Sequence, residues 1–282
     1  MSSGEAFARA RSEGRAAFIG YLPAGFPSYD GCVAAFRALV DAGVDVVEIG
    51  VPYSDPVIDG PVNQAGMQVA LENGTTVHDV LRTVEAVAST GVAAVVMSYW
   101  NPVLRYGVER FAADLVAAGG QGLITPDLVP DEAADWLAAS AEHDLDRIFL
   151  VAPSSSEARI AMTVDACRGW VYAASTMGVT GARAVTSTVA PALVRRTQQA
   201  TSLPVAVGLG VSNGDQAAEV ASYADGVVVG SALVRCLLDA DTEVAGAVAV
   251  HQLALDLADG VRRAHNGHAD RRDETAADSL EA

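Results

Sequence analysis

Eight short runs of β-branched and small apolar residues recur along this 282-residue chain, each followed by turn residues and a helical stretch rich in Ala and Leu. Strands that alternate with helices in this way form parallel sheets with right-handed crossovers. Eight such units in about 250 residues favour a closed barrel over an open doubly wound sheet. We therefore predict an α/β fold, a single (β/α)₈ TIM barrel over residues 1–264. The predicted strands are Ala17–Leu22, Asp45–Gly50, Val92–Ser98, Gly122–Thr125, Arg147–Val151, Trp170–Ala174, Pro204–Gly208 and Gly226–Gly230.

Three segments depart from the eight-fold pattern. An extra N-terminal helix is predicted at Ser3–Ser12, where it would close the bottom of the barrel. The connection Pro52–Glu72, between the second strand and its helix, is unusually long, and such connections are commonly functional loops. Residues 265–282 are small, polar and charged, so we predict a disordered acidic tail there.

The chain contains no lysine, because all 18 of its basic residues are arginines. No side chain can therefore form a Schiff base with a carbonyl substrate or anchor pyridoxal phosphate covalently. A P-loop is excluded as well, since its lysine contacts the β- and γ-phosphates. Histidines and cysteines show no metal-ligand spacing, so we expect no metal site.

The charge balance and the apolar segments limit partners and location. Thirty-five acidic residues give a net charge of −17, which disfavours nucleic acid and anionic membranes as partners. Three cysteines without CxxC spacing are typical of a reducing compartment. No signal peptide or transmembrane segment is predicted, and we therefore expect a cytoplasmic protein.

Glu48 is the first candidate for chemistry. Strand alternation places it with Val46 and Gly50, facing either the barrel interior or the layer between strands and helices. Both places are poor in water, and desolvation raises the pKa of a carboxyl group into the range useful for a general acid or base. The alternative is a structural glutamate that backbone or hydroxyl groups satisfy. Asp59 lies in the long connection beside it, in an Asp-Gly-Pro turn where a purely turn-forming role is the alternative.

Glycines follow the last three predicted strands, and aromatic residues stand at other strand ends. Loops after the seventh and eighth strands of such barrels often bind phosphate through backbone N–H groups, although glycine also simply ends strands. The apolar residues could line a pocket for a planar substrate, with core packing as the alternative. The glycine clusters are Gly178–Gly181, Gly208–Gly210 and Gly230-Ser231, and the pocket candidates include Tyr21, Tyr99, Tyr172 and Leu209.

Residues 48–61, EIGVPYSDPVIDGP, closely resemble the signature of the tryptophan synthase alpha chain family. Five further motifs occur in matching order, so the resemblance extends from about Ala16 to Arg263. These motifs are YLPAGFP (21–27), MSYWNP (97–102), PDLVP (126–130), GVTG (178–181) and GLGVS (208–212).

This resemblance implies a lyase that cleaves indole-3-glycerol phosphate to indole and glyceraldehyde 3-phosphate in tryptophan biosynthesis. It implies no cofactor in this chain, and a beta-chain partner that carries pyridoxal phosphate in an α₂β₂ heterotetramer. By position, Glu48 would be the catalytic acid and base, and Asp59 would hold the indole N–H. Tyr21, Tyr99, Tyr172, Thr180 and Leu209 would bind the substrate, with Thr180 on the mobile loop after the sixth strand. Gly181, Gly210, Gly230 and Ser231 would hold the phosphate, and Asp55 and Asn101 would fall near the beta-chain surface.

Two positions depart from the family pattern. Phe26 occupies the place of a common Asp before Pro27, and Thr176 occupies that of a frequent Arg or Lys. Because of these two departures, the resemblance does not define the contacts with the beta chain or the closure of the loop after the sixth strand. Other functions considered are a stand-alone lyase that releases free indole, a non-catalytic subunit that activates a partner, and a barrel isomerase. The isomerase is disfavoured because the first strand, Phe18-Ile-Gly-Tyr-Leu, ends without an acid or cysteine.

Overall fold

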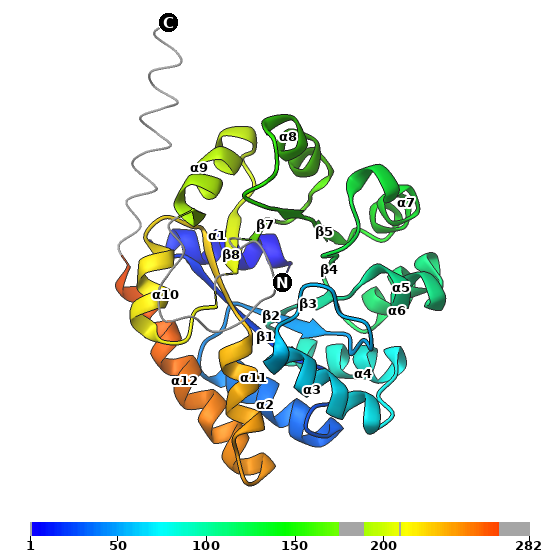
Figure 1. The fold of residues 1–282 in the computed structure, drawn as a ribbon, viewed down its shortest axis with the longest axis vertical. Coiled ribbons are helices and arrows are strands. Elements are labelled where there is room, and N and C mark those ends of the chain that lie inside the picture. The colour runs from blue at the N-terminus through cyan, green and yellow to red at the C-terminus, as the bar shows by residue number, and fades with distance from the viewer. Residues whose placement is uncertain (1, 175–188, 209, 265–282) are drawn as a thin grey trace, which may run out of the picture.

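The computed structural model describes residues 2–174, 189–208 and 210–264, and these residues form a barrel of parallel strands ringed by helices (Figure 1). Within them the strands form one sheet in the order β5-β4-β3-β2-β1-β9-β8-β7-β6. Every pairing between neighbours in that order is parallel, as the alternating sequence pattern predicts. The strands are β1 (Ala17–Pro23), β2 (Val46–Gly50), β3 (Ala93–Met97), β4 (Gly122–Ile124), β5 (Asp146–Ile148), β6 (Leu150–Val151), β7 (Val171–Ala174), β8 (Val205–Gly208) and β9 (Gly226–Val229).

The two ends of this sheet belong to one stretch of chain. β5 and β6 are separated only by Phe149, β5 pairs with β4, and β6 pairs with β7. The predicted fifth strand is therefore present in two pieces, and it closes the sheet into a barrel. Eight predicted strands thus account for all the strands in the described residues, and the TIM-barrel prediction is confirmed.

The helices match the predicted connections, with three additions. The long connection after β2 is not only a loop, because its second half forms α3, which begins with Pro61 at a position where proline is favoured. Two more short helices, α5 and α11, also lay outside the prediction. In chain order, the described residues hold α1 (Ser3–Ser12), α2 (Tyr29–Asp41), α3 (Pro61–Glu72), α4 (Val77–Ala88), α5 (Trp100–Tyr106), α6 (Val108–Ala117), η1 (Pro130–Glu132), α7 (Ala134–Glu142), α8 (Glu157–Ala166), α9 (Ala190–Ala200), α10 (Gly214–Ala221), α11 (Ser231–Leu238) and α12 (Glu243–Arg263).

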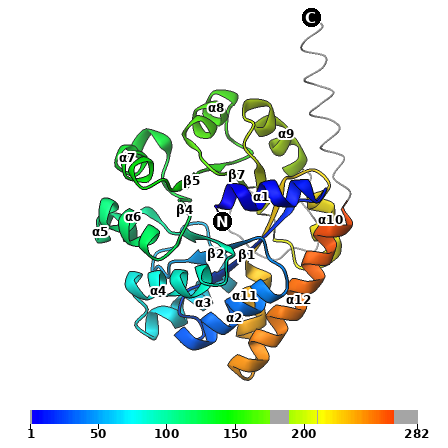
Figure 2. The same cartoon turned by 180° about the vertical axis from the view of Figure 1, so that it is seen from behind.

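Helix α1 lies across the amino-terminal end of the barrel, as predicted, and Figure 2 shows it there from behind. It begins with a capping box in which Ser2 and Glu5 exchange side-chain to backbone hydrogen bonds. Its apolar face enters the interior cluster of buried side chains, which includes Phe7. The Phe7 ring lies 5.6 Å from that of Trp170, which in turn stacks on Tyr172 at the same spacing. A column of aromatic rings therefore runs from the closed end of the barrel toward its open end.

Alternation along the strands divides the core into two clusters. One fills the barrel interior and includes Val46 and Val95, while the other lies between strands and helices and includes Val47 and Ile49. Since Glu48 shares the face of Val46, its side chain points into the barrel interior. The sequence left two directions open for this residue, and the structure decides between them.

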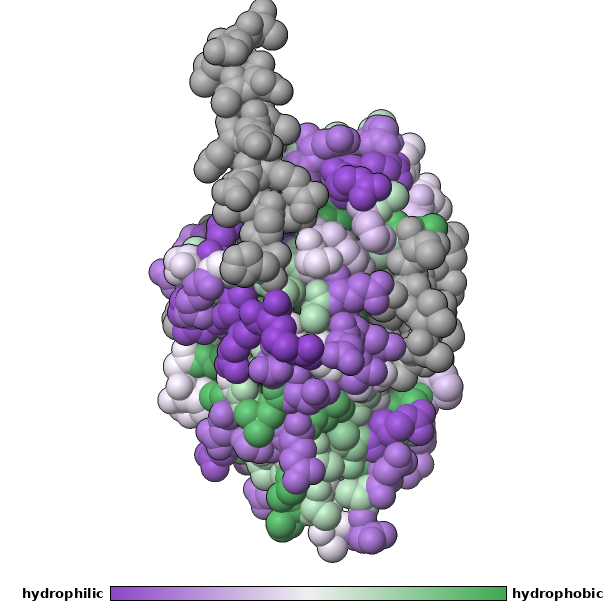
Figure 3. Space-filling model, turned by 90° about the vertical axis from the view of Figure 1, so that its left-hand side faces the viewer, coloured by the Kyte–Doolittle hydropathy of each residue, from purple (hydrophilic) through white to green (hydrophobic). Residues whose placement is uncertain are grey.

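Helix α12 is the one described helix that is long and apolar enough, by length and composition alone, to cross a membrane. It packs against α2, α10 and α11 as part of the outer ring of the barrel. Its solvent face carries Val244, Val248 and Leu255 among polar residues. The space-filling view of this side shows the same mixture of apolar and hydrophilic surface (Figure 3). These contacts are those of an amphipathic helix that covers the barrel.

Candidate active site

Four strands bring the predicted catalytic residues and three tyrosines to the open end of the barrel. Tyr21 on β1 lies opposite Glu48 on β2 in the sheet register. Tyr172 is on β7, and Tyr99 follows β3. Burial raises the pKa values of Tyr21 and Tyr172, and the charges of Glu48 and Asp59 raise both further. Both carboxyl groups are therefore close enough to both tyrosines to interact with them electrostatically.

Glu48 is an almost wholly buried carboxyl group with little to stabilise its charge. Its side chain is 1% exposed, and its Oε2 atom has no hydrogen-bond partner. No arginine forms an ion pair with it among the described residues. Burial raises its pKa from 4.5 to about 8, with a smaller contribution from the charge of Asp59. Glu48 is therefore protonated near neutral pH and can donate a proton, as a general acid must.

Asp59 is equally buried but has two side-chain hydrogen-bond donors. The hydroxyl of Tyr99 donates to its Oδ2 at 2.7 Å, and the amide Nδ2 of Asn63 donates to its Oδ1 at 3.1 Å. Burial raises the pKa of Asp59 above its ordinary value, and these two hydrogen bonds reduce that rise without reversing it. The two carboxyl groups thus differ in how well their anions are stabilised, and such a difference separates an acid from a stabilising anion.

Tyr99 fixes the loop that carries Asp59. Its hydroxyl accepts hydrogen bonds from the backbone N–H groups of Val57 and Ile58, both at 3.0 Å, while it donates to Asp59. Its ring lies 5.3 Å from that of Tyr53 at the start of the same loop. The hydroxyl of Tyr99 therefore holds the loop after β2 against the end of β3, a role that the sequence did not reveal.

Glycines at the strand ends give the tyrosine rings their room. A Cβ atom at Gly50 would lie 2.6 Å from the hydroxyl of Tyr21, and one at Gly208 would lie 2.3 Å from that of Tyr172. A Cβ at Gly230 would meet Tyr21 at 3.1 Å. Only residues without a side chain fit at the first two positions, so these glycines shape the apolar walls of the site.

Comparison with known proteins agrees with this geometry. The family model described as tryptophan synthase alpha chain matches residues 7–262. The chain belongs to the tryptophan synthase alpha chain family. It is 62% identical over 260 residues to the tryptophan synthase alpha chain of Acidothermus cellulolyticus, covering 92% of this chain and 97% of that one. It is 60% identical over 258 residues to that of Nocardia farcinica, with 92% and 95% covered.

Solved structures from the family show the same fold. A chain of Mycobacterium tuberculosis tryptophan synthase superposes with a TM-score of 0.87 at 57% identity, covering 92% of this chain and 98% of that one. The tryptophan synthase alpha subunit of Legionella pneumophila gives a TM-score of 0.84 at 30% identity, with 93% and 98% covered. The barrel is therefore retained across the family even where most residues differ.

Three of the predicted phosphate ligands are described, and they lie at the ends of two neighbouring strands. Gly210 follows β8 with a positive φ of 64°, and Gly230 follows β9 directly. Gly230 also caps α11, whose first residue is Ser231, and no side chain caps that helix terminus. The backbone N–H groups of a helix start are well placed for an anion. Thr176, Thr180, Gly181 and Leu209 lie outside the described residues.

The positions expected near the partner surface lie at the open end of the barrel. Asp55 and Asn101 are both exposed, and Asn101 donates through Nδ2 to the hydroxyl of Tyr53 at 3.3 Å. Phe26, which departs from the family pattern, is instead 3% exposed and packs in the core between helices and strands. That substitution therefore exchanges a polar side chain for a core contact.

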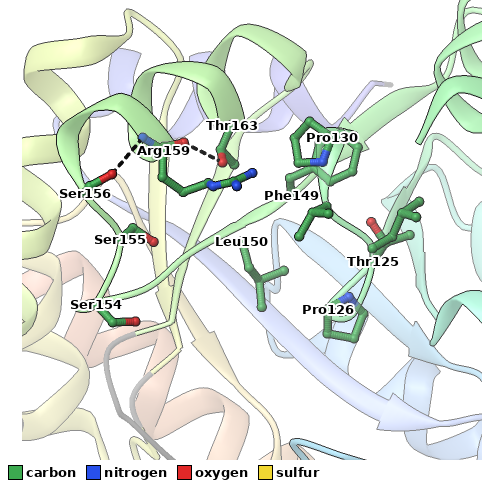
Figure 4. A pocket seen from close by; sticks show the side chains of 12 residues that line it. Thr125, Pro126, Pro130, Phe149, Leu150, Ser154, Ser155, Ser156, Arg159 and Thr163 are labelled. Carbon is green, nitrogen blue, oxygen red and sulfur yellow. Dashed lines mark hydrogen bonds between the residues drawn. The ribbon is translucent and has the colours of Figure 1, made fainter. Parts of the chain in front are cut away.

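A separate cavity of about 470 Å³ opens beside the ends of β4 and β6. Its lining includes Thr125 from the loop after β4, Phe149 between β5 and β6, Ser154 from the loop after β6 and Arg159 on α8, and Figure 4 shows these side chains around the cavity. None of the predicted site residues lines it. Among the described residues there is also no cluster of His, Cys, Asp and Glu suited to a metal ion.

Asn63 is the site residue that sequence reasoning missed. It stands four positions after Asp59 in the first turn of α3, which begins at Pro61, and its side chain contacts Asp59 just before the N-cap residue Gly60. The proline and the spacing are both visible in the sequence. They would have revealed the contact had the second half of the long connection been assigned as a helix.

Proposed function

We propose that this chain is the alpha subunit of a tryptophan synthase and cleaves indole-3-glycerol phosphate to indole and glyceraldehyde 3-phosphate. The observation that carries the proposal is the pair of buried carboxyl groups, Glu48 and Asp59, at the open end of a barrel of this family. This is a carbon–carbon bond cleavage, and it needs an electron acceptor within the substrate because the chain has no lysine to supply one.

The indole ring of the substrate is the electron acceptor in the mechanism that we propose. Glu48, protonated because burial raises its pKa, donates a proton to C3 of indole and leaves a cationic ring with a C=N bond. The Glu48 carboxylate then removes the proton of the neighbouring carbinol hydroxyl. The C–C bond breaks, its electron pair restores the aromatic ring, and the carbinol carbon becomes the aldehyde. Glu48 ends protonated and ready for another turnover.

Asp59 stabilises the cationic ring in this scheme. An ionised carboxylate near the indole N–H attracts the positive charge that develops when C3 is protonated, and such placed charges contribute strongly to catalysis. Tyr99 and Asn63 each use one side of the Asp59 carboxylate, and each oxygen retains a further lone pair for the substrate.

The remaining contacts are proposed for the two ends of the substrate. Tyr21, Tyr172 and Leu209 would line the pocket for the indole ring, with Tyr99 behind Asp59. Gly210, Gly230 and Ser231 would hold the phosphate through backbone N–H groups and one hydroxyl, together with Gly181 and Thr180. Phosphate binding by main-chain groups is consistent with a chain that has no lysine.

The partner that we propose is a tryptophan synthase beta chain, in an α₂β₂ heterotetramer located in the cytoplasm. Pyridoxal phosphate would be on that beta chain, because this chain has no lysine to form its Schiff base. Asp55 and Asn101, both exposed at the open end of the barrel, are suited to the contact surface.

The test is incubation of the full chain with indole-3-glycerol phosphate, with and without a beta chain, with indole release as the readout. We expect slow release by the chain alone and faster release in the complex. Full activity without a beta chain would support the stand-alone lyase, and a complex that forms but releases no indole would support the activating subunit. Asp59→Asn is expected to reduce the rate by about 10²–10³-fold, with little change in the free energy of unfolding.

A further inference from the structure

Asn63 places a buried amide against the functional carboxylate. Its side chain lies in the first turn of α3, the residue is 5% exposed, and Nδ2 donates to Asp59 Oδ1. Its own Oδ1 is buried and has no partner. The opposite orientation of this amide would place its oxygen against an anionic oxygen, so the carboxylate itself determines how the amide is turned.

Two carboxyl groups that share a water-poor space compete for one proton. The group with more hydrogen-bond donors keeps its charge, and the other takes the proton. Asp59 has the donors of Tyr99 and Asn63, whereas Oε2 of Glu48 has none. Removal of one donor from Asp59 would therefore make the two carboxyl groups more alike in how well their anions are stabilised. The proposed mechanism depends on that difference, because it needs Asp59 charged and Glu48 protonated.

The remaining groups around Asp59 offer no substitute for these donors. Besides Glu48 on β2, the titratable groups that interact with it are Tyr21 on β1, Tyr172 on β7 and Tyr99 after β3. No arginine pairs with Asp59 anywhere in the described ranges. Within the described residues, the ionised form of Asp59 therefore depends on two neutral donors.

We infer that Asn63 is a positioning residue that holds the carboxylate of Asp59 in its orientation and in its charged form for the proposed reaction. The adjacent Gln64 acts on the same turn in a different way, because its Nε2 donates to the backbone carbonyl of Asp59 at 2.7 Å. One amide thus fixes the carboxylate, and its neighbour fixes only the main chain. This pair offers a matched comparison of the two effects.

The inference rests on the proposed function, and the experiment separates the two. The pH dependence of kcat/KM for indole-3-glycerol phosphate is measured in the complex with a beta chain, for the wild type and for Asn63→Leu, Asn63→Ala and Gln64→Leu. Leu keeps the approximate size of Asn but cannot donate. The acid limb of this profile reports Asp59 in the free enzyme, since Asp59 must be ionised for the reaction.

Both Asn63 variants should move the acid limb upward by about one to two pH units, because a hydrogen bond to a charged group is lost. Their activity should approach that of the wild type as the pH rises toward the alkaline limb. Gln64→Leu should lower activity by a similar factor at every pH and leave the limb in place. Two Asn63 variants are used so that the test still works if one of them does not fold.

A wild type that never releases indole would overturn the proposed function. An active wild type, with Asn63 variants whose profiles run parallel to it, would overturn the inference alone. An equal shift of the acid limb in Gln64→Leu would also overturn the inference. The shift would then result from a change in the main-chain turn and not from loss of the Asn63 amide.

Discussion

Two buried acidic residues stand three positions apart on the same strand segment and have opposite surroundings. Asp45, just before β2, accepts hydrogen bonds from Arg15 at 2.6 and 2.9 Å, from Arg9 at 3.1 Å and from the backbone N–H of Phe18 at 2.9 Å. Glu48, in the middle of that strand, pairs with no arginine among the described residues, and one of its oxygens has no hydrogen-bond partner. At the closed end of the barrel the charge of Asp45 is paired with arginines. At the open end the carboxyl group of Glu48 has no ion-pair partner among the described residues.

This difference indicates that the paired carboxylate at the closed end serves stability and that the unpaired carboxyl group at the open end serves function. A buried carboxylate that is fully paired contributes to folding, and removal of its partner leaves an uncompensated charge. A buried carboxyl group without partners costs stability when it ionises, so its presence indicates a function. Asp146, also at the closed end, is an intermediate case: Ser3 donates to it and Arg168 lies at 3.8 Å, yet burial still raises its pKa.

The largest effect is expected at the open end. Glu48→Gln removes the proposed proton donor and acceptor while keeping the size and shape of the side chain. Indole release should fall by about 10³–10⁴-fold, because one group performs two proton transfers. The measurement is indole release by the variant in complex with a beta chain, with circular dichroism to confirm folding. Turnover within tenfold of the wild type would assign the proton transfers to another group.

A smaller effect, of the opposite kind, is expected at the closed end. Asp45→Asn removes the buried anion that pairs with Arg15, whose side chain is only 11% exposed, and leaves that guanidinium with the more exposed Glu13 at 2.7 Å as its anionic partner. The free energy of unfolding should fall by about 3–5 kcal/mol, as for other broken buried pairs. Urea unfolding provides the measurement, and Asp55→Asn on the exposed rim serves as the control, with a change under about 0.5 kcal/mol. Equal changes in the two variants would contradict the contrast between paired and exposed sites.

A further effect concerns how the free energy of unfolding depends on pH. The folded-state pKa of Glu48 lies above its ordinary value of 4.5, so the folded protein binds more protons than the unfolded chain between pH 4.5 and about 8. Glu48 therefore lowers the free energy of unfolding as the pH rises through this window. Glu48→Gln should remove that loss and be more stable than the wild type at pH 8.5, but not at pH 4. Parallel curves for the two proteins from pH 4 to 8.5 would show that Glu48 ionises without cost.

The sequence predicted the barrel well, because its signals are local. Alternation of apolar strands with amphipathic helices is decided within each unit, and α1 begins and ends at the predicted residues, Ser3 and Ser12. Helix α3 was missed because its residues carry only a weak amphipathic pattern beside the turn residues of the loop. The split between β5 and β6 has no counterpart in the sequence, where Arg147 is followed by one continuous apolar run, Ile148–Val151.

The site was predicted in part, and the reasons are physical. Glu48 could be found because a charged residue within an apolar strand is costly, and Asp59 because it follows in the loop. The hydrogen bond between Tyr99 and Asp59 could not, since it joins residues forty positions apart through the pairing of β2 with β3. The contribution of Tyr99 to the charge of Asp59 is therefore a property of the fold, whereas the contribution of Asn63 is local to the start of α3.

The most direct test of the central claim is the ionisation of Glu48 itself. The carboxyl ¹³C shifts of glutamate-labelled protein are followed as the pH changes, and the signal of Glu48 is the one missing from Glu48→Gln. A midpoint near pH 8 is the predicted result, as expected for a carboxyl group that is buried and unpaired. A midpoint near its ordinary value of 4.5 would contradict the account, because Glu48 would then be ionised at neutral pH and unable to donate the first proton.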